Sequence, residues 1–451
     1  MDRKAIKELM VSGLMERAGE PLPTSRLGRI GRIGATALRS GLMIARARKG
    51  AAGRDEPGVD MEKVAKVVSS MGELKGVMMK MGQIMSYIDV AMPAELRDAL
   101  SVLQTHAQPM EWGTVRDLVA EELGERGERL LEGMEHRPIS SASIGQVHRA
   151  TLPDGSVAAV KIQYPEIARA IAADFGPAAV GTKMAAVFFP HARIDDFVAE
   201  ARERFLEECD YLHEAHCQDR FVEIYGDHPI LAVPEVHREY CSRRVLCTAF
   251  LDGLDLDAFL ATDPPQEERD RMGEALFEFY IGALFRHGIY NCDPHPGNYL
   301  FLDGGRVGML DHGCTRQFEP RFVARLANLT RAVHLDERDA VHRALLDLKI
   351  VREGKRYDYD TIRGFLRGFY GPMLVDDRTA VDTSSAMDVR EVMDKKLKLA
   401  KFSLPGEFLF LFRIRFGLMS VLSRLGARAN WYRLERRYVQ DFANAHPILS
   451  R

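Results

Sequence analysis

Three polar residues in the middle of the chain could together hold a divalent cation and activate an attacking group. Asp293 opens the stretch Asp-Pro-His-Pro-Gly-Asn, Asn298 closes it, and Asp311 lies further along. Amide and carboxylate oxygens suit Mg²⁺, which fills the rest of its shell with water and substrate phosphates. We expect Asn298 and Asp311 to bind the metal. Asp293 would be the catalytic residue that orients or deprotonates a hydroxyl or water.

The chain between Asn298 and Asp311 predicts a β-hairpin. Residues 299–302 and 306–310 are mostly apolar, and the Asp-Gly-Gly at 303–305 is a turn signal. Antiparallel pairing across that turn would bring Asn298 and Asp311 to the same end of the ribbon. The D-x-x-x-x-N spacing alone is a weak signal, because a proline-rich loop that starts with Asp and ends with Asn is also common turn chemistry.

A second group of residues, upstream, could hold phosphates. Small side chains at 140–145 would let backbone N–H groups approach a phosphate. The candidates are Ser140, Ser141, Ala142, Ser143 and Gly145. Lys161 lies in the predicted strand 157–163 and needs an anionic partner, for which Glu214 is the obvious candidate. Without Asn298 and Asp311, an ordinary edge-strand lysine would be the better interpretation of Lys161.

The composition is that of a globular protein. The chain has 451 residues, of which 46% are hydrophobic and 28% charged, enough for roughly three domains or one large bilobal fold with extensions. A net charge of −3 disfavours nucleic-acid binding by bulk charge. The six cysteines form no C-x-x-C pair, which indicates a reduced compartment and buried thiols. We expect neither a secretory signal nor a transmembrane helix.

The N-terminal part predicts a basic arm followed by an amphipathic helix. Residues 21–54 contain basic but no acidic side chains. Such an arm could dock reversibly on an anionic bilayer or remain a solvated, poorly ordered segment. Between residues 60 and 90 apolar side chains recur in steps of three and four, which predicts a helix with a methionine-rich core face. Lys80 and Gln83 flank that face one turn apart.

The remaining pattern predicts the elements that would carry these residues. We expect a hairpin of strands 146–151 and 157–163, a helix over 195–223, and a strand over 244–250. A helix over 267–286 leads to Gly288, and the chain after 320 is almost wholly helical apart from 375–385.

Occurring together and in this order, the motifs resemble the UbiB/AarF (ADCK) family of atypical kinases, protein-kinase-like proteins linked to ubiquinone biosynthesis. The likeness runs from about Leu22 through the final helices. Lys80 to Gln83 match the family's KxGQ signature. Residues 140–147 match its alanine-rich nucleotide loop, and Lys161 matches its strand lysine.

The likeness continues downstream. Glu208 to Asp210 match the ExD signature, and Glu214 stands where the family's helix glutamate pairs with the strand lysine. Asp293 to Asn298 match the catalytic loop, and Asp311 matches the metal aspartate of the DFG element. The resemblance implies that Lys80, Gln83, Glu208 and Asp210 gate the cleft.

The resemblance also implies an α+β, bilobal protein-kinase-like fold with a small β-rich N-lobe and a helical C-lobe. An N-terminal helical KxGQ extension would lie where a peptide substrate binds in protein kinases. The expected parts follow in chain order. They are a basic arm (1–55), the KxGQ extension (56–137), the N-lobe with a helical insert (138–250), the C-lobe with catalytic and metal loops (251–345), and the C-terminal helices (346–451).

The implied activity is Mg²⁺-dependent binding and turnover of ATP, or binding of ADP, in support of prenyl-lipid metabolism. Nothing after residue 313 resembles an A-P-E element, which disfavours phosphorylation of proteins in trans. Expected partners are the nucleotide, an anionic membrane surface or isoprenoid lipid, and quinone-biosynthesis proteins. We expect a cytoplasmic protein, with peripheral attachment at the inner membrane as an option.

The sequence departs from the family pattern in three places. The nucleotide loop begins with Ser140-Ser141 instead of alanines, which bears on the choice between ATP and ADP. Asn291-Cys292 stands where the family often has His-Ala, and His312 replaces the phenylalanine of DFG. We expect His312 to lack the apolar packing that phenylalanine provides, with consequences for rate and regulation.

Several alternatives stay open. In a regular helix Glu208 and Asp210 would point to different sides, whereas Asp210 and Glu214 would share a face. Glu208 could therefore meet Lys80 or belong to a solvated acidic face. The Asp293 loop is also similar to that of aminoglycoside and choline kinases, which are small-molecule phosphotransferases. A third interpretation is a nucleotide-gated, lipid-binding scaffold with negligible turnover.

Overall fold

The computed structural model describes residues 109–142, 144–165, 207–354, 356–382 and 406–449. The basic arm, the KxGQ segment with Lys80 and Gln83, residue Ser143 and the side chains of Ser141 and Ala142 lie outside what it describes. The described chain groups into two units. Unit 1 ends at Tyr211 and includes Glu239–Cys247; unit 2 consists of Leu212–Arg238 and the chain from Thr248 onward.

The described part of unit 1 contains a small four-stranded sheet and two helices. The helices are α6 (Trp112–Leu123) and α7 (Glu125–Glu132). The sheet has the order β1-β2-β3-β5, formed by β1 (Ser140–Ala142), β2 (Gly145–Thr151), β3 (Val157–Gln163) and β5 (Val245–Ala249), of which the last two residues belong to unit 2.

The predicted β2–β3 hairpin is confirmed, with Val147 opposite Lys161 and His148 opposite Val160. Asp154 stabilises its turn, because its Oδ1 accepts the backbone N–H of Ser156 at 2.9 Å. Side chains alternate along β3, so that Ala158, Val160 and Ile162 are fully buried while Lys161 is only half-buried.

A buried polar chain ties the segment before α6 to β2. The His148 Nδ1 lies 2.8 Å from the Glu135 carbonyl, which can only accept, so Nδ1 donates and Nε2 accepts from Gln146 at 2.8 Å. The Gln146 Oε1 in turn accepts the Met110 N–H at 2.6 Å. Burial lowers the pKa of His148 below its ordinary value, which keeps the ring neutral in this network.

Of the elements that the structure describes, unit 2 carries three small sheets and most of the helices. The sheets are β4-β8-β7 and the antiparallel pair β6-β9; their strands are β4 (Leu231–Ala232), β6 (Ile289–Asn291), β7 (Tyr299–Leu302), β8 (Arg306–Met309) and β9 (Thr315–Gln317). A further pair joins β10 (Thr379–Ala380) to β11 (Arg428–Ala429). The longer helices are α11 (Tyr211–Tyr225), α13 (Gln266–Phe277), α15 (Pro320–His334), α16 (Arg338–Asp347), α17 (Tyr359–Tyr370), α19 (Gly406–Leu425) and α20 (Trp431–Ala445). Shorter ones are α12 (Leu256–Ala261), η4 (Glu278–Gly282), α14 (Ala283–His287), η5 (Pro296–Asn298) and η6 (Gly371–Leu374); η3 (Arg238–Tyr240) spans the boundary between the units.

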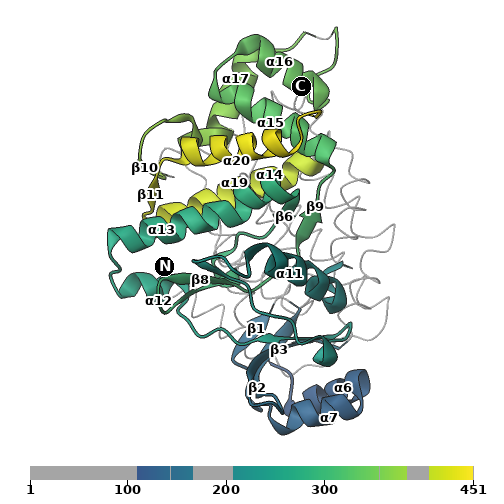
Figure 1. Ribbon diagram of the computed structural model, residues 1–451. Coiled ribbons are helices and arrows are strands. Elements are labelled where there is room, and N and C mark those ends of the chain that lie inside the picture. Colours follow the sequence, from purple (N-terminus) through teal and green to yellow (C-terminus); the bar gives the residue numbers. More distant parts are fainter. Residues whose placement is uncertain (1–108, 143, 166–206, 355, 383–405, 450–451) are drawn as a thin grey trace, which may run out of the picture. The chain divides into compact units, whose positions relative to one another are not determined.

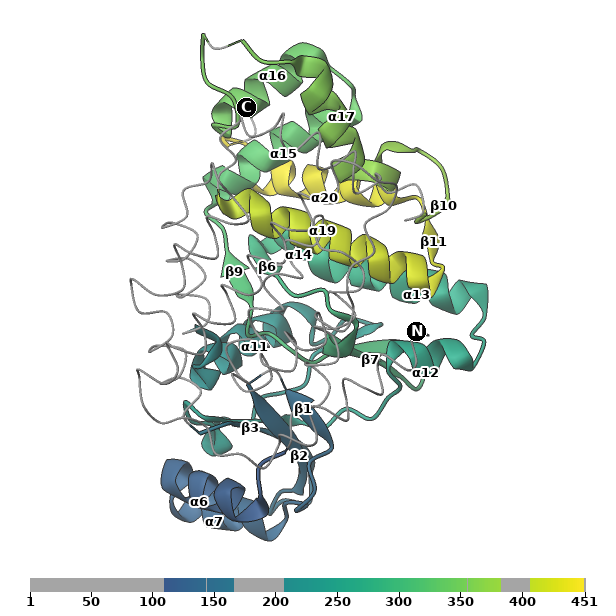
Figure 2. The same ribbon diagram turned by 180° about the vertical axis from the view of Figure 1, so that it is seen from behind.

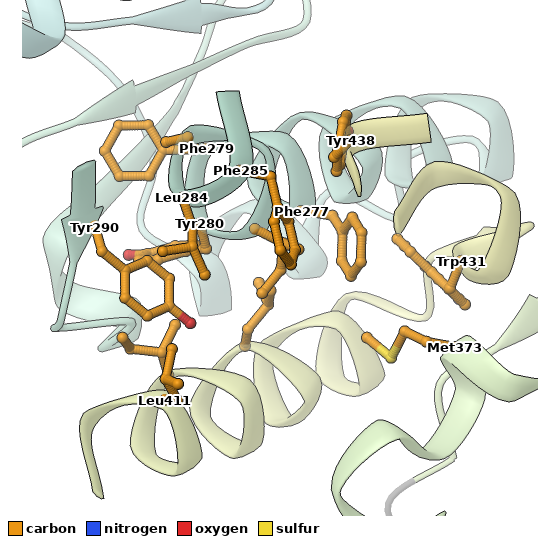
Figure 3. Packing of buried hydrophobic residues seen from close by; sticks show 14 of the residues in the cluster. Phe277, Phe279, Tyr280, Leu284, Phe285, Tyr290, Met373, Leu411, Trp431 and Tyr438 are labelled. Atoms are coloured by element: carbon orange, nitrogen blue, oxygen red, sulfur yellow. The ribbon is translucent and has the colours of Figure 1, made fainter. Parts of the chain in front are cut away.

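The core of unit 2 lies between its helices. α13 runs beside α19, and α14 beside α20, in both views (Figures 1 and 2). Figure 3 shows this packing, in which Phe277 of α13 and Phe285 of α14 lie together with Trp431 of α20. All three side chains are almost fully buried. Large aromatic side chains therefore supply much of the apolar area that holds these helices together.

These elements confirm the α+β class, while the five predicted part boundaries stay predictions. Two local predictions need correction. The helix predicted over 195–223 is interrupted in its described part, because the chain leaves the helix at Cys209 and α11 begins at Tyr211. The helix predicted over 267–286 contains a π-helical turn, η4. Among the helices that the structure describes, none has the length and apolar character needed to cross a membrane. All six cysteines are free thiols, five of them buried.

Unit 2 also buries an ionic cluster between α15, α19 and α20. Glu435 is fully buried and pairs with Arg415 and with the His334 Nε2, the latter at 2.9 Å. The Arg415 guanidinium lies 4.6 Å from the centre of the Tyr370 ring. Burial alone would raise the pKa of Glu435, but Arg415 and His334 outweigh it, so the pKa of this carboxyl is lowered.

We predict that Glu435→Gln lowers the free energy of unfolding by about 3–5 kcal/mol, because it leaves the buried Arg415 charge uncompensated. Urea denaturation measures the loss. Asp336→Asn, which breaks an exposed pair with Arg363, is the matched control and should change stability little. Equal effects of the two substitutions would contradict this view of the cluster.

The low pKa of His148 predicts a pH dependence of stability. At a pH between the ordinary pKa of 6.5 and the lower pKa of the folded state, His148 is protonated more in the unfolded chain than in the native protein. The free energy of unfolding therefore falls as the pH decreases below about 6.5. Urea denaturation of wild type and His148→Gln at about pH 7.5 and about pH 5.5 checks this. The variant should lose less stability over that range, and an equal loss would refute the assignment.

Candidate functional site

The β7–β8 hairpin brings Asn298 and Asp311 to one end of the ribbon, as the sequence predicts. Tyr299 pairs with Met309 and Leu302 with Arg306, across a turn in which Gly304 and Gly305 adopt left-handed φ values of 77° and 73°. Beyond the last pair, the Leu310 N–H donates to the Asn298 carbonyl at 2.8 Å. The residue that precedes β7 and the one that follows Leu310 are therefore neighbours in space.

The Asn298 amide is oriented by the loop that it closes. Its Nδ2 donates to the Asp293 carbonyl at 3.1 Å. The amide oxygen, Oδ1, is thus the end of the side chain that can serve as a ligand for a hard cation. Asp293, Asn298 and Asp311 are all partly exposed.

One buried side chain ties the Asp293 loop to the Asp311 loop. Asn291, only 1% exposed, donates from Nδ2 to the Asp311 carbonyl at 2.8 Å. Its Oδ1 accepts the Asp293 N–H at 2.9 Å. Sequence reasoning noted Asn291 only as a departure from the family pattern. The missed signal is that an amide two residues before Asp293 can donate to one loop and accept from the other.

Glu214 lies beside the Asp311 loop. Gly313 donates its N–H to the Asp311 Oδ1 at 3.0 Å. A Cβ added to Gly313 would lie 3.3 Å from the Glu214 Oε2 and 3.4 Å from the Asp311 Oδ1. Two carboxylates thus flank the same glycine, and Glu214 is 3% exposed. The carboxylate oxygens on the two sides of this glycine are ligands of the kind that a hard cation binds.

His312 occupies an aromatic slot, so the expectation that it lacks apolar packing is wrong. The side chain is fully buried. Its ring centre lies 5.1 Å from that of Phe221 on α11 and 6.2 Å from that of Phe279 in η4. The imidazole therefore packs where an aromatic ring would, and it links the metal loop to the helix that carries Glu214.

In unit 1 the predicted phosphate loop includes residues of two paired strands. Ser140–Ala142 form β1, and Ala142 pairs with Gly145. Gly145 has no room for a side chain, because a Cβ there would lie 2.2 Å from the Ile162 carbonyl oxygen. The backbone groups of residues 140–142 are thus shared with β2, and the predicted contact of this segment with phosphate stays a prediction.

Lys161 lies on the sheet face that it shares with the start of β1. Ser140 pairs with Val147, and Val147 with Lys161, so the three side chains lie in one row across the strands. The Lys161 Nζ lies 5.1 Å from the centre of the Tyr211 ring. The predicted pairing of Lys161 with Glu214 joins residues of different units and stays a prediction.

The two acidic residues of the ExD motif do not belong to one regular helix. Glu208 is in a helical turn, whereas Asp210 follows the break and lies 3.4 Å from Arg243. The argument about helix faces therefore does not apply to them. Their predicted role with Lys80 and Gln83 concerns residues that the structure does not describe and stays a prediction.

We predict that Asn291→Ala lowers the free energy of unfolding by about 2 kcal/mol, because it leaves a buried carbonyl and a buried N–H without their partner. Urea denaturation measures this. Asn328→Ala removes a surface amide that accepts from Arg331 and is the matched control. A loss no larger than that of the control would show that Asn291 does not join the two loops.

Comparisons with known proteins agree with this arrangement. A family model described as the ABC1 atypical kinase-like domain matches residues 102–345. The Danio rerio protein named atypical kinase COQ8B, mitochondrial, is 29% identical over 352 residues, which cover 75% of this chain and 56% of the relative. Atypical kinase COQ8, mitochondrial, of Saccharomyces cerevisiae is 26% identical over 339 residues, covering 72% of this chain and 66% of the relative.

A solved structure is also similar. The complex of Rv3197 with erythromycin from Mycobacterium tuberculosis has a TM-score of 0.60 and 27% identity, and the match covers 85% of this chain and 97% of that one. The chain thus spans a little more than half to about two thirds of the length of the two curated relatives, but nearly all of this solved one. Because the family model covers more than half of the sequence, the chain belongs to the ABC1 (UbiB/AarF/ADCK) family of atypical kinases, with their bilobal kinase-like fold.

Proposed function

We propose that the chain binds ATP, or ADP, with Mg²⁺ and cleaves or transfers the terminal phosphate. The observation that carries this is the meeting of Asn298 and Asp311 at one end of the β7–β8 hairpin, with Glu214 across Gly313 from Asp311. An amide oxygen and carboxylates form the oxygen-rich ligand set that Mg²⁺ prefers. Bound Mg²⁺ would neutralise phosphate charge.

In this proposal each residue of the candidate site has a defined task. Asn298 and Asp311 hold the metal. Asp293 orients the attacking hydroxyl or water and takes its proton. Lys161, Glu214 and the β1–β2 turn with Ser140, Ser141, Ala142, Ser143 and Gly145 hold the nucleotide. Lys80, Gln83, Glu208 and Asp210 gate access to it.

The proposed biological role is support of ubiquinone or other prenyl-lipid biosynthesis. It follows from the resemblance to the UbiB group and from relatives named as atypical kinases. The proposed setting is the cytoplasmic side of an inner membrane, where the protein would meet anionic or isoprenoid lipid and quinone-biosynthesis proteins. Phosphorylation of proteins in trans is not part of the proposal.

We predict that ATP or ADP with Mg²⁺ raises the melting temperature by about 5 °C, because a ligand that binds only the native state stabilises it. Asp311→Asn should lose the Mg²⁺-dependent part of the shift and any turnover. Asp303→Asn, on the exposed turn of the same hairpin, is the matched control and should keep both. Absence of a shift with either nucleotide in the wild-type chain would refute the proposal.

The fate of the phosphate separates this function from its alternatives. Release of phosphate that is stimulated by anionic liposomes supports the lipid-linked role. Transfer of a labelled γ-phosphate to a soluble metabolite, without lipid dependence, would identify a small-molecule phosphotransferase. Nucleotide binding without turnover would identify a nucleotide-gated scaffold.

A further inference from the structure

A π-helical turn stands shortly before the catalytic loop. Between α13 and α14, the Ala283 N–H bonds to the Glu278 carbonyl, five residues back rather than four. The extra residue shifts the register of the side chains that follow. Phe279 and Tyr280 lie in this turn and are both almost fully buried. They contact different motif loops, since Phe279 lies against His312 and Tyr280 reaches the Asp293 loop.

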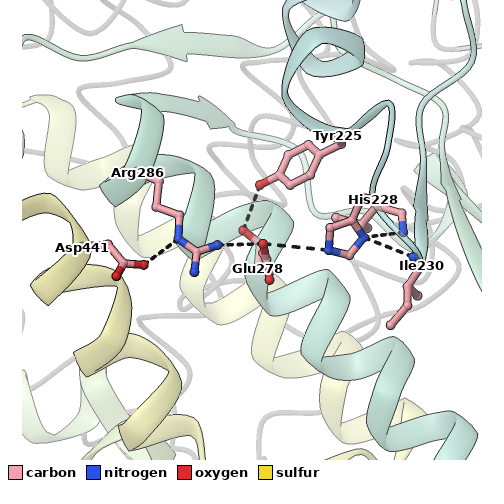
Figure 4. Close-up of polar contacts among 7 residues, drawn as sticks. Tyr225, His228, Ile230, Glu278, Arg286 and Asp441 are labelled. Atoms are coloured by element: carbon pink, nitrogen blue, oxygen red, sulfur yellow. Dashed lines mark hydrogen bonds and ion pairs between the residues drawn. The ribbon is translucent and has the colours of Figure 1, made fainter. Parts of the chain in front are cut away.

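The register of this turn is held by a polar network (Figure 4). The Glu278 carbonyl also accepts a hydrogen bond from the Tyr225 hydroxyl at 3.3 Å. The Glu278 carboxylate accepts one from Arg286 at 2.8 Å, and Arg286 donates to Asp441 of α20 at 2.8 Å. The wider turn is therefore anchored on both sides.

Tyr280 donates its hydroxyl to the Asp293 carbonyl at 3.2 Å. The same carbonyl accepts the Asn298 Nδ2 at 3.1 Å, so both of its lone pairs have donors. Figure 3 shows Tyr280 among the buried aromatic side chains that hold its ring in place. The next carbonyl in the loop, that of Pro294, faces the hydroxyl of a second buried tyrosine, Tyr299, at 3.5 Å.

The covalent geometry of the loop makes these bonds on the Asp293 carbonyl decisive. The ring of Pro294 fixes its own φ and favours extended backbone at Asp293, so the ψ torsion of Asp293 is the rotation that can still vary at this junction, over a limited range. Pro294 is itself packed against α19, where a Cβ on Gly417 would lie 2.4 Å from its Cγ. Rotation about ψ would swing the Asp293 carbonyl away from Asn298. The hydrogen bonds to that carbonyl oppose this rotation.

We propose that Tyr280 is a positioning residue for phosphoryl transfer. Its buried hydroxyl fixes the Asp293 peptide and thereby holds the Asp293 carboxylate and the Asn298 amide in their working places. This inference rests on the proposed function. It adds a residue that lies outside every motif considered in the sequence.

The test compares Tyr280→Phe with Tyr225→Phe in the full-length chain. Both substitutions remove one buried hydroxyl that donates to a backbone carbonyl near η4, and both keep the ring. Of these two tyrosines, only Tyr280 contacts the catalytic loop. Tyr280→Phe should lower kcat about fivefold to tenfold and leave KM for ATP within about twofold of wild type. Tyr225→Phe should leave both constants within about twofold of wild type, because the Ala283 N–H still bonds to the Glu278 carbonyl and keeps the register of the turn. Equal kcat values for the two variants would overturn the proposal.

Hydrogen exchange supplies a readout that does not depend on turnover. In peptides that cover residues 293–298, the backbone amide hydrogens should exchange faster in Tyr280→Phe than in the wild type. They should also exchange faster than in Tyr225→Phe. Unchanged exchange in Tyr280→Phe would overturn the proposal, whatever the kinetics. A wild-type chain that neither binds nucleotide nor turns it over would refute the proposed function, and exchange would then still decide whether Tyr280 braces the loop.

Discussion

The candidate site depends on one constraint, the antiparallel register of β7 with β8. With Tyr299 opposite Met309, the chain enters and leaves the hairpin at the same end, and the Leu310 N–H closes on the Asn298 carbonyl. A slip of one residue would turn every side chain of one strand to the other face and separate Asn298 from Asp311. The two positive-φ glycines of the turn hold that register, because few other residues adopt such backbone angles.

Around this hairpin, polar side chains bond to backbone groups of the two loops and hold them in place. Asn291 bonds to the Asp311 carbonyl and the Asp293 N–H, while Asn298 and Tyr280 bond to the Asp293 carbonyl. Backbone groups fixed in this way set the direction of each side chain. In the proposed function this would position the side-chain oxygens of Asp293 and Asp311 before a cation or phosphate binds, which lowers the cost of binding.

Sequence reasoning succeeded where the signal is local and failed where it depends on distant contacts. Both hairpins follow from alternation and turn residues next to each other in the chain, so strand 157–163 and the meeting of Asn298 with Asp311 could be predicted. The local sequence does not indicate the π turn at 278–282, because side chains outside the turn, Tyr225 and Arg286, stabilise it. The approach of Glu214 to Gly313 and the aromatic slot of His312 likewise need the packing of α11.

Two departures from the family pattern lie next to the loops of the candidate site, and each side chain connects these loops to their surroundings. Asn291, two residues before Asp293, donates to the Asp311 carbonyl and accepts the Asp293 N–H. His312, where the family has phenylalanine, places a planar ring against Phe221 of α11 and Phe279 of η4. One departure therefore joins the two loops through hydrogen bonds, and the other joins the Asp311 loop to α11 through ring packing.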